Sequence, residues 1–243
     1  MIVLIITAVR VKSMDSHRIS GRILAENIAG PGMMRLVEQS MQARAQKTSV
    51  TEIAVKERKY PQAALTFDDG PDIRYTPLLL DGLKERNVRV SFFLLGEKVE
   101  QYPELVERMQ KEGHLVGNHT YHHVQLNKLN ETKAREEILK TNNLIYETTG
   151  VYPLYLRPPF GAWKKNLELC VEMLPVFWTI DTLDWKVQNT EKIVRTVQEQ
   201  IEDGAIILMH DEYDTSVEAA LQVVDELKNQ GYELVTVDQL ILP

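Results

Sequence analysis

The part of the chain that follows Tyr60 alternates short runs of β-branched and aromatic residues with longer amphipathic stretches. This alternation is typical of strand-helix units around a parallel sheet. About seven such units predict an α/β fold, a distorted or incomplete (β/α) barrel, with an open doubly wound sheet as the weaker alternative. The runs expected to form strands are residues 63–67, 88–95, 115–117, 154–156, 176–180, 205–209 and 234–237.

Helices are expected between these strands. Asn189 or Thr190 can cap the start of one helix, because short polar side chains accept hydrogen bonds from the first free amides. Glycines that can end helices in a left-handed conformation follow several amphipathic stretches. The expected helices include residues 98–111, 131–148, 190–202 and 216–230, and these glycines are Gly113, Gly150, Gly204 and Gly231.

Residues 15–59 are polar, and we expect an N-terminal extension and linker in residues 1–59, followed by one catalytic domain in residues 60–243. The apolar run at residues 2–9 is far shorter than the roughly 20 residues that cross a bilayer. It is either the remnant of a signal or anchor or an ordinary hydrophobic start, and membrane association is expected only through this extension. The lone Cys170 has no second cysteine to pair with and is predicted to be a small buried hydrophobe.

The charge of the chain bears on its partners. The formal net charge is -7 at pH 7, whereas a polyanionic partner such as nucleic acid normally calls for a basic surface. We therefore expect no nucleic acid partner. An uncharged polymer or a cationic product suits this charge better, and the sequence implies no protein partner.

Polar residues gather where five of the predicted strands end. The carboxyl ends of parallel barrel strands are where enzymes of this architecture place their chemistry. A single polar residue there can be a turn former or a cap, but five clusters on five strands are hard to attribute to capping. The clusters are Asp68-Asp69, Asn118-His119, Arg157, Asp181 with Asp184, and His210-Asp211.

The adjacent carboxylates of Asp68 and Asp69 precede a glycine and a proline. Taken alone, this segment is a turn whose aspartates cap the next helix. Two carboxylates side by side also suit a division of labour, in which one binds a metal ion and the other takes a proton from water. Asp72 is expected to be the turn or cap residue.

His119 and His123 lie four positions apart, so they share one face if the segment forms a helical turn, and both can then bind one ion through neutral ring nitrogens. The alternative is a surface or capping histidine cluster. A carboxylate and two histidines on the same rim can fill three positions around a divalent metal and leave the fourth for water. His122 faces away from this pair and is expected to be a bystander or a supporting group.

The segment that begins at Arg157 continues with two prolines, Phe160 and Gly161, a stiff turn that holds the guanidinium in place. A planar, permanently charged donor beside a carboxylate would orient it; the alternative is an exposed arginine in a weak surface salt bridge. Asp184 and His210 are either buried structural groups or an acid-imidazole pair.

In this order, the five segments resemble the polysaccharide deacetylases of the NodB-homology type, also called family 4 carbohydrate esterases. The segments that carry the resemblance are TFDDGPD, HTYHH, RPPFG, DTLDW and LMH. The resemblance extends from about Ala63 to Val237 and leaves the first 59 residues outside it. One such motif would be weak evidence, whereas five in order are highly specific.

The resemblance implies a distorted barrel and one divalent metal ion, usually zinc, with cobalt as an alternative. It implies that Asp69, His119 and His123 bind this ion. By the same comparison, Asp68 is the catalytic base and Arg157 orients it.

The resemblance also implies roles on the opposite side of the site. His210 would be the catalytic acid, paired with Asp184. The backbone amide of Phe160 would help to hold the oxyanion, and Trp185 and Leu208 would line the pocket for the acetyl methyl group. Many relatives have tyrosine at the position of Phe160, but a role of the backbone amide tolerates that change.

The activity implied by the resemblance is hydrolysis of N-acetyl groups on the N-acetylglucosamine units of a glycan, with peptidoglycan ahead of chitin-type oligomers. The alternative is O-deacetylation of acetylated xylan, because nothing in the motifs separates an amide from an ester. A non-catalytic glycan-binding protein is a further alternative, which the complete motif set disfavours. A cell-wall substrate implies an extracytoplasmic or cell-surface location.

Overall fold

The computed structural model describes residues 59–163 and 173–241. Within these residues, the strands form one parallel sheet in the order β5-β4-β3-β2-β1-β7-β6, and β8 pairs beside β1. Cys170 and nearly all of the predicted extension lie outside the described residues. The strands are β1 (Gln62–Asp68), β2 (Ser91–Leu94), β3 (Leu115–Asn118), β4 (Tyr155–Leu156), β5 (Leu174–Pro175), β6 (Ile180–Asp181), β7 (Ala205–His210) and β8 (Glu233–Leu234).

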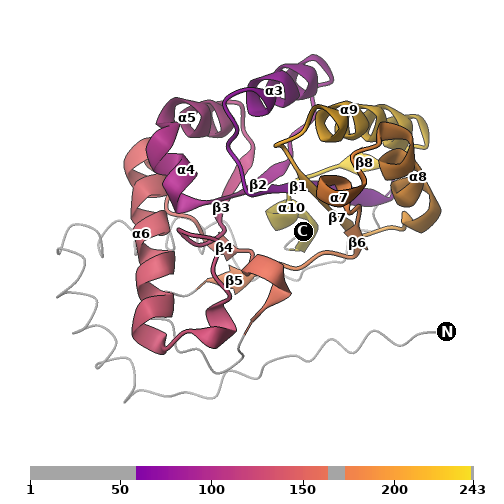
Figure 1. Cartoon of the computed structure of the whole chain (residues 1–243). Coiled ribbons are helices and arrows are strands. Elements are labelled where there is room, and N and C mark those ends of the chain that lie inside the picture. Colours follow the sequence, from indigo (N-terminus) through magenta and orange to yellow (C-terminus); the bar gives the residue numbers. More distant parts are fainter. Residues whose placement is uncertain (1–58, 164–172, 242–243) are drawn as a thin grey trace, which may run out of the picture. The chain divides into compact units, whose positions relative to one another are not determined.

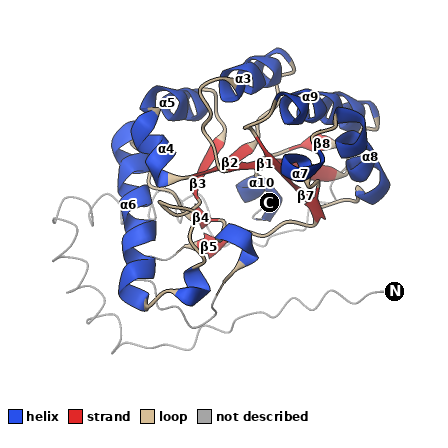
Figure 2. Cartoon of the chain, viewed as in Figure 1, coloured by secondary structure: helices blue, strands red, loops and turns tan. Residues whose placement is uncertain are grey.

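Helices lie along the outer side of the curled sheet, and α10 lies on its inner side (Figure 1). Figure 2 shows the strands together, with most of the helices around them. No helix among the described residues combines the length and the apolar character needed to cross a bilayer. The helices are α3 (Tyr75–Glu85), α4 (Gly96–Gln101), α5 (Pro103–Lys111), α6 (Glu131–Thr149), α7 (Asp184–Val187), α8 (Thr190–Gln200), α9 (Asp214–Asn229) and α10 (Val237–Ile241), with short 3-10 turns η1 (Leu126–Lys128) and η2 (Pro159–Gly161).

The predicted fold class, a distorted and incomplete (β/α) barrel, is confirmed. Within the described residues, the path of paired strands starts at β5 and ends at β6, so the curled sheet stays open between these two strands. We call this opening the seam. The strand predicted at residues 176–180 is wrong, because this segment crosses the seam and strand pairing covers only its ends. Val176 N–H bonds to Leu156 O on the β4 side, and Thr179 N–H bonds to Ile206 O on the β7 side.

Two other predicted strands are too long. The prediction for residues 88–95 shortens to β2, because the chain is still in a loop at Val88 and Val90 although both are buried. The prediction for residues 234–237 contains only the end of β8, and α10 already begins at Val237. Apolar residues just beyond the ends of a strand can be buried as well. The apolar pattern alone therefore predicts strands that are too long.

The two faces of β1 have different neighbours because side chains alternate along a strand. Leu65 and Phe67 point to the large core beneath the outer helices. Ala64 belongs to the inner cluster that contains Phe93 and Val237. Asp68, two strand periods from Ala64, therefore ends the strand on the inner face.

Several helix ends follow the predicted signals, but Gly204 does not end α8, whose C-cap is Ile201 in an extended conformation. The side chain of Asn189 accepts a hydrogen bond of 2.9 Å from Lys192 N–H at the start of α8. Gly150 ends α6 with a positive φ of 70°, which an L side chain rarely adopts. Asp72 accepts hydrogen bonds from the amides of Arg74 and Tyr75, as expected of a turn residue.

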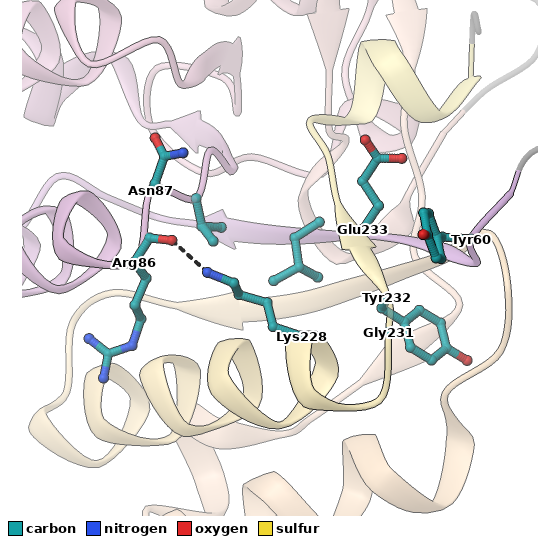
Figure 3. Close-up of a pocket in the computed structure, with 9 residues that line it drawn as sticks. Tyr60, Arg86, Asn87, Lys228, Gly231, Tyr232 and Glu233 are labelled. Carbon is teal, nitrogen blue, oxygen red and sulfur yellow. Dashed lines mark hydrogen bonds between the residues drawn. The ribbon is translucent and has the colours of Figure 1, made fainter.

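A pocket of about 530 Å³ lies near the amino ends of β1, β2 and β8 (Figure 3). The five polar clusters lie at the opposite, carboxyl ends of the strands. Its charged groups have partners of their own. Lys228 Nζ donates to Arg86 O at 2.7 Å, and the Arg86 guanidinium donates twice to Asp225. Glu233 accepts from Gln62. The polar chemistry of the domain therefore concentrates at the other rim.

Candidate functional site

The carboxyl ends of the strands bring all five polar clusters to one rim. Asp68 ends β1, Asn118 ends β3 and His210 ends β7. In the sheet, Asp68 lies directly opposite His210 on the neighbouring strand. The strand ends thus place a carboxylate and an imidazole from residues 142 positions apart on one surface.

Asp68 and Asp69 differ in backbone conformation and therefore in direction. Asp68 is the last residue of β1 and is 3% exposed. Asp69 follows the strand with a φ of 67°, a left-handed conformation that turns its side chain out of the alternation of the strand. The two carboxylates consequently point in different directions, although they are adjacent in sequence and both lie near His119 Nε2.

Arg157 holds the Asp68 carboxylate. Its side chain is fully buried, and Nη1 donates to Asp68 Oδ1 at 2.8 Å and to Thr66 Oγ1 at 2.6 Å. Burial lowers the pKa of Arg157, and the charge of Asp68 and its hydrogen bond oppose that shift. The guanidinium also lies over the ring of Phe93, with its carbon 4.3 Å from the ring centre. Arg157 is therefore a buried partner of Asp68 and not an exposed arginine in a surface salt bridge.

His119 is held in one tautomer. Its Nδ1 lies 2.6 Å from the carbonyl oxygen of Arg157, and since a carbonyl can only accept, Nδ1 carries the proton. In the neutral ring, Nε2 then presents a lone pair. This atom lies 3.3 Å from Asp69 Oδ1, so two electron-pair donors face each other across the site.

His123 completes a cluster of three potential ligands. Its Nε2 lies 3.4 Å from Asp69 Oδ1, and one ligand atom from each of Asp69, His119 and His123 lies within 4.8 Å of the other two. Burial lowers the pKa of His123, although the charge of Asp69 opposes the shift. Burial would raise the pKa of Asp69, but the facing imidazoles of His119, His123 and His210 lower it below its usual range.

These residues fit a divalent metal ion. Among the described residues, the buried Oδ1 of Asp69 has no hydrogen-bond partner, and the lone pair of His119 Nε2 points at the same space. A tetrahedral ion with bonds of 2.0–2.1 Å separates its ligand atoms by about 3.3 Å, which agrees with the two separations measured from Asp69. One carboxylate and two imidazoles form a donor set that suits zinc.

The helical turn predicted for His119 to His123 is wrong. The segment is a loop in which Thr120 and His123 have positive φ values of 67° and 54°. These backbone turns, and not a helix face, bring the two imidazoles to a centroid separation of 5.0 Å. His122 points elsewhere, as expected, and its Nδ1 lies 2.8 Å from Glu137.

His210 and Asp184 form the second buried pair of the site. His210 Nδ1 donates to Asp184 Oδ1 at 2.8 Å, and His210 N–H donates to Asp184 Oδ2 at 2.8 Å. Burial alone would lower the pKa of His210, but the hydrogen bond and charge of Asp184, together with Asp68 and Asp69, raise it to about 9. The free Nε2 lies 3.8 Å from Asp69 Oδ2, on the side of the potential metal ligands.

Three further predicted residues border this site from different elements. Phe160 lies in η2 with a φ of 59°, is 62% exposed, and has its ring 4.5 Å from that of His123. Trp185 lies in α7 beside Asp184 and is half exposed. Leu208 is buried in β7, opposite Thr66 and two residues before His210.

Sequence reasoning assigned no role to several residues that shape the site. Thr66 accepts from Arg157 and donates to Ile207 O, and its place two residues before Asp68 on the same strand face was a usable signal. Asn118 Oδ1 accepts from Thr120 N–H at 2.7 Å. Glu137 contacts the histidine loop from α6, and no sequence signal pointed to it.

Comparison with known proteins yields a consistent group of relatives. A family model described as polysaccharide deacetylase matches residues 56–177. The chain is 42% identical over 185 residues to a protein named peptidoglycan-N-acetylglucosamine deacetylase from Listeria monocytogenes. It is 43% identical over 177 residues to one named peptidoglycan-N-acetylmuramic acid deacetylase from Bacillus subtilis. These alignments span 76% and 73% of this chain, but only 40% and 38% of those relatives.

A similar structure supports the same grouping. The structure titled peptidoglycan deacetylase PdaC from Bacillus subtilis matches with a TM-score of 0.73 and 42% sequence identity. The match covers 75% of this chain and 91% of that one. The similarity therefore includes almost all of that chain.

Proposed function

The chain belongs to the polysaccharide deacetylase family, and on this premise we propose that it is a metal-dependent hydrolase that removes N-acetyl groups from N-acetylglucosamine units of peptidoglycan. The observation that carries the proposal is the single rim that holds the Asp69, His119 and His123 cluster between two buried ion pairs. The names of the relatives favour peptidoglycan over chitin-type oligomers and over acetylated xylan.

Asp69, His119 and His123 would hold one divalent ion, with zinc as the first choice and cobalt as the alternative. Such an ion supplies Lewis acidity, which polarises the acetyl carbonyl and makes water more acidic. His119 is prepared for this task because its Nδ1–H is bonded to the Arg157 carbonyl, which fixes the tautomer and the ring orientation.

Asp68 is the proposed base. Arg157 fixes its Oδ1, while Oδ2 lies 3.7 Å from His119 Nε2 and so faces the ligand cluster. From this position the carboxylate takes a proton from the attacking water as the new carbon-oxygen bond forms. Arg157 keeps the carboxylate in this orientation through the whole reaction.

His210 is the proposed acid. Its Nδ1–H is committed to Asp184, so Nε2–H is the proton that can be donated to the leaving amine nitrogen as the carbon-nitrogen bond breaks. The products are acetate and a free glucosamine unit. The Phe160 amide would help to stabilise the oxyanion, and Trp185 and Leu208 would contact the acetyl methyl group.

The decisive experiment for this activity measures acetate release from peptidoglycan, chitooligosaccharide and acetylxylan, with chelator and after zinc is added back. We expect release from peptidoglycan, its loss with chelator and its recovery with zinc. Analysis of the peptidoglycan product by mass spectrometry identifies whether glucosamine or muramic acid is deacetylated. Exclusive activity on acetylxylan, or glycan binding without turnover, would refute the proposal.

Asp68→Asn tests the mechanism within the same assay. The variant should lose acetate release and retain zinc, because Asp68 takes the proton but does not belong to the proposed ligand set. Asp72→Asn is a suitable control, since Asp72 bonds turn amides and lies outside the cluster. Near wild-type turnover by Asp68→Asn would remove the base assignment.

An extracytoplasmic or cell-surface location is proposed because peptidoglycan is outside the cytoplasmic membrane. Fractionation of cells that express the full-length chain tests this point. Recovery of all the protein in the cytosolic fraction would contradict it.

A further inference from the structure

The loop that carries both histidine ligands has an unfavourable backbone conformation. Thr120 and His123 are non-glycine residues with positive φ, and each such residue costs roughly 1–2 kcal/mol. Neither a helix nor a strand includes residues 119–123. Contacts from neighbouring elements must therefore hold this loop in its ligand-presenting shape.

Glu137 supplies three of those contacts from α6. One carboxylate oxygen, Oε2, accepts the backbone amides of Tyr121 at 3.0 Å and His122 at 2.9 Å. The other, Oε1, lies 2.8 Å from His122 Nδ1. The Glu137 side chain is only 16% exposed, whereas that of His122 is 58% exposed. Two consecutive loop amides thus have one protected acceptor.

The same helix also holds the start of the loop through hydrogen bonds from Asn118. Asn118 Nδ2 donates to Ile138 O at 2.9 Å and to Asn142 Oδ1 at 2.6 Å. Asn118 Oδ1 in turn accepts the amide of Thr120. The helix therefore fixes the loop both just before His119, through Asn118, and between the two ligands, through Glu137.

We propose that Glu137 is a positioning residue that sets the metal affinity of the site by holding the 119–123 loop through the amides of Tyr121 and His122. It touches neither ligand ring. It acts by fixing the backbone between the two ligands, so that Nε2 of each imidazole reaches the same space as Asp69 Oδ1. The inference rests on the metal site of the proposed function, but not on the substrate or the reaction.

The alternative is that Glu137 acts only through its negative charge, which would attract any nearby cation. Two variants separate the effect of the negative charge of Glu137 from that of its side-chain length. Glu137→Gln removes the charge, but its carbonyl oxygen can still accept both amides and its amide nitrogen can donate to His122 Nδ1. Glu137→Asp keeps the charge, but its carboxylate is one methylene too short to accept the amides.

The experiment measures the dissociation constant for zinc in the metal-free full chain, by competition with a chromophoric chelator. We expect Glu137→Ala and Glu137→Asp to bind zinc about 10- to 100-fold more weakly than the wild type, the usual cost of removing a group that orients a ligand. Glu137→Gln should bind zinc as the wild type does. Glu136→Gln is the matched control, because Glu136 is the exposed neighbour on the same helix.

His122→Ala separates the backbone contacts from the side-chain contact and should leave zinc affinity close to that of the wild type. Circular dichroism and thermal unfolding of each metal-free variant report folding, and if Glu137→Ala does not fold, Glu137→Asp decides the question. Wild-type affinity in a folded Glu137→Asp or Glu137→Ala variant overturns the proposal. So does a loss in Glu137→Gln that Glu137→Asp does not share, which would assign the effect to charge. If the wild type itself binds no zinc, the metal site fails together with this inference.

Discussion

Replacing Asp184 by asparagine should lower the pKa of His210. Without a bound metal ion, the hydrogen bond and charge of Asp184 outweigh burial and raise the pKa of His210 from 6.5 to about 9. Asparagine has nearly the same shape and can still accept the His210 amide, but it removes the charge. The pKa of His210 should therefore fall towards 6.5, since only the charges of Asp68 and Asp69 then oppose the effect of burial.

The size of the effect on activity follows from the fraction of His210 that is protonated. At pH 7.5 a group with a pKa of about 9 is almost fully protonated, whereas a group with a pKa of 6.5 is about one tenth protonated. If His210 is the acid, kcat/KM at pH 7.5 should fall by up to about tenfold, and the basic limb of the pH profile should move towards acid by up to about 2.5 pH units.

The same shift contributes to folding stability. The folded pKa of His210 is raised, so its contribution is fully present below about pH 6.5 and is lost as the pH rises through about 9. A difference of about 2.5 units corresponds to about 3 kcal/mol. The 12% exposure of the His210 side chain leaves little solvent screening. Asp184→Asn should therefore lower the free energy of unfolding at pH 6 by up to that amount.

Two measurements test this reasoning. NMR titration of the histidine ring protons in the metal-free protein reports the pKa of His210 directly, and acetate release from zinc-loaded enzyme gives kcat/KM against pH. Asp181→Asn is the control, because this aspartate ends β6 close by and its carboxylate accepts the Leu183 amide. An unchanged His210 titration and basic limb in Asp184→Asn would refute the acid assignment and its physical basis.

Two other predictions concern buried charge. Arg157→Met should lower the free energy of unfolding by about 3–5 kcal/mol, because it leaves the Asp68 carboxylate buried without its partner; urea unfolding measures this, and a loss below 1 kcal/mol would contradict it. His114 is buried and accepts the Val90 amide, and burial lowers its pKa to about 4. Protonation of His114 should thus contribute a loss of about 3 kcal/mol of stability as the pH falls from 6.5 to 4, and in urea unfolding the change in stability between these pH values should differ by about that amount between the wild type and His114→Asn.

The sequence predicted the fold class because strand and helix periodicities are local properties of the chain. It also predicted which residues meet, since parallel strands bring their carboxyl ends to one rim. It failed at residues 176–180, where an apolar run looks like a strand but crosses the seam. Whether such a run finds pairing partners depends on the closure of the whole sheet, which no local window contains.

The sequence likewise predicted only part of the site. The cluster of Asp69, His119 and His123 was predicted, but the backbone that presents the two histidines was not. A helical spacing of four residues and a loop with two left-handed residues both bring imidazoles together, and the sequence alone does not distinguish them. Glu137 was missed because its contacts are to backbone amides, which every residue has.

The seam has a consequence for how this domain can change over evolutionary time. The guanidinium of Arg157 points Nε and Nη2 towards Val176 O and Phe177 O, at 3.4 and 3.5 Å, while Nη1 holds Asp68. One side chain therefore fastens the open edge of the barrel and orients the proposed base. A lineage that abandons catalysis can discard a metal ligand at little cost to folding, but losing this arginine would also loosen the edge. Among inactive descendants of such a domain, Arg157 should be retained longer than the proposed metal ligands.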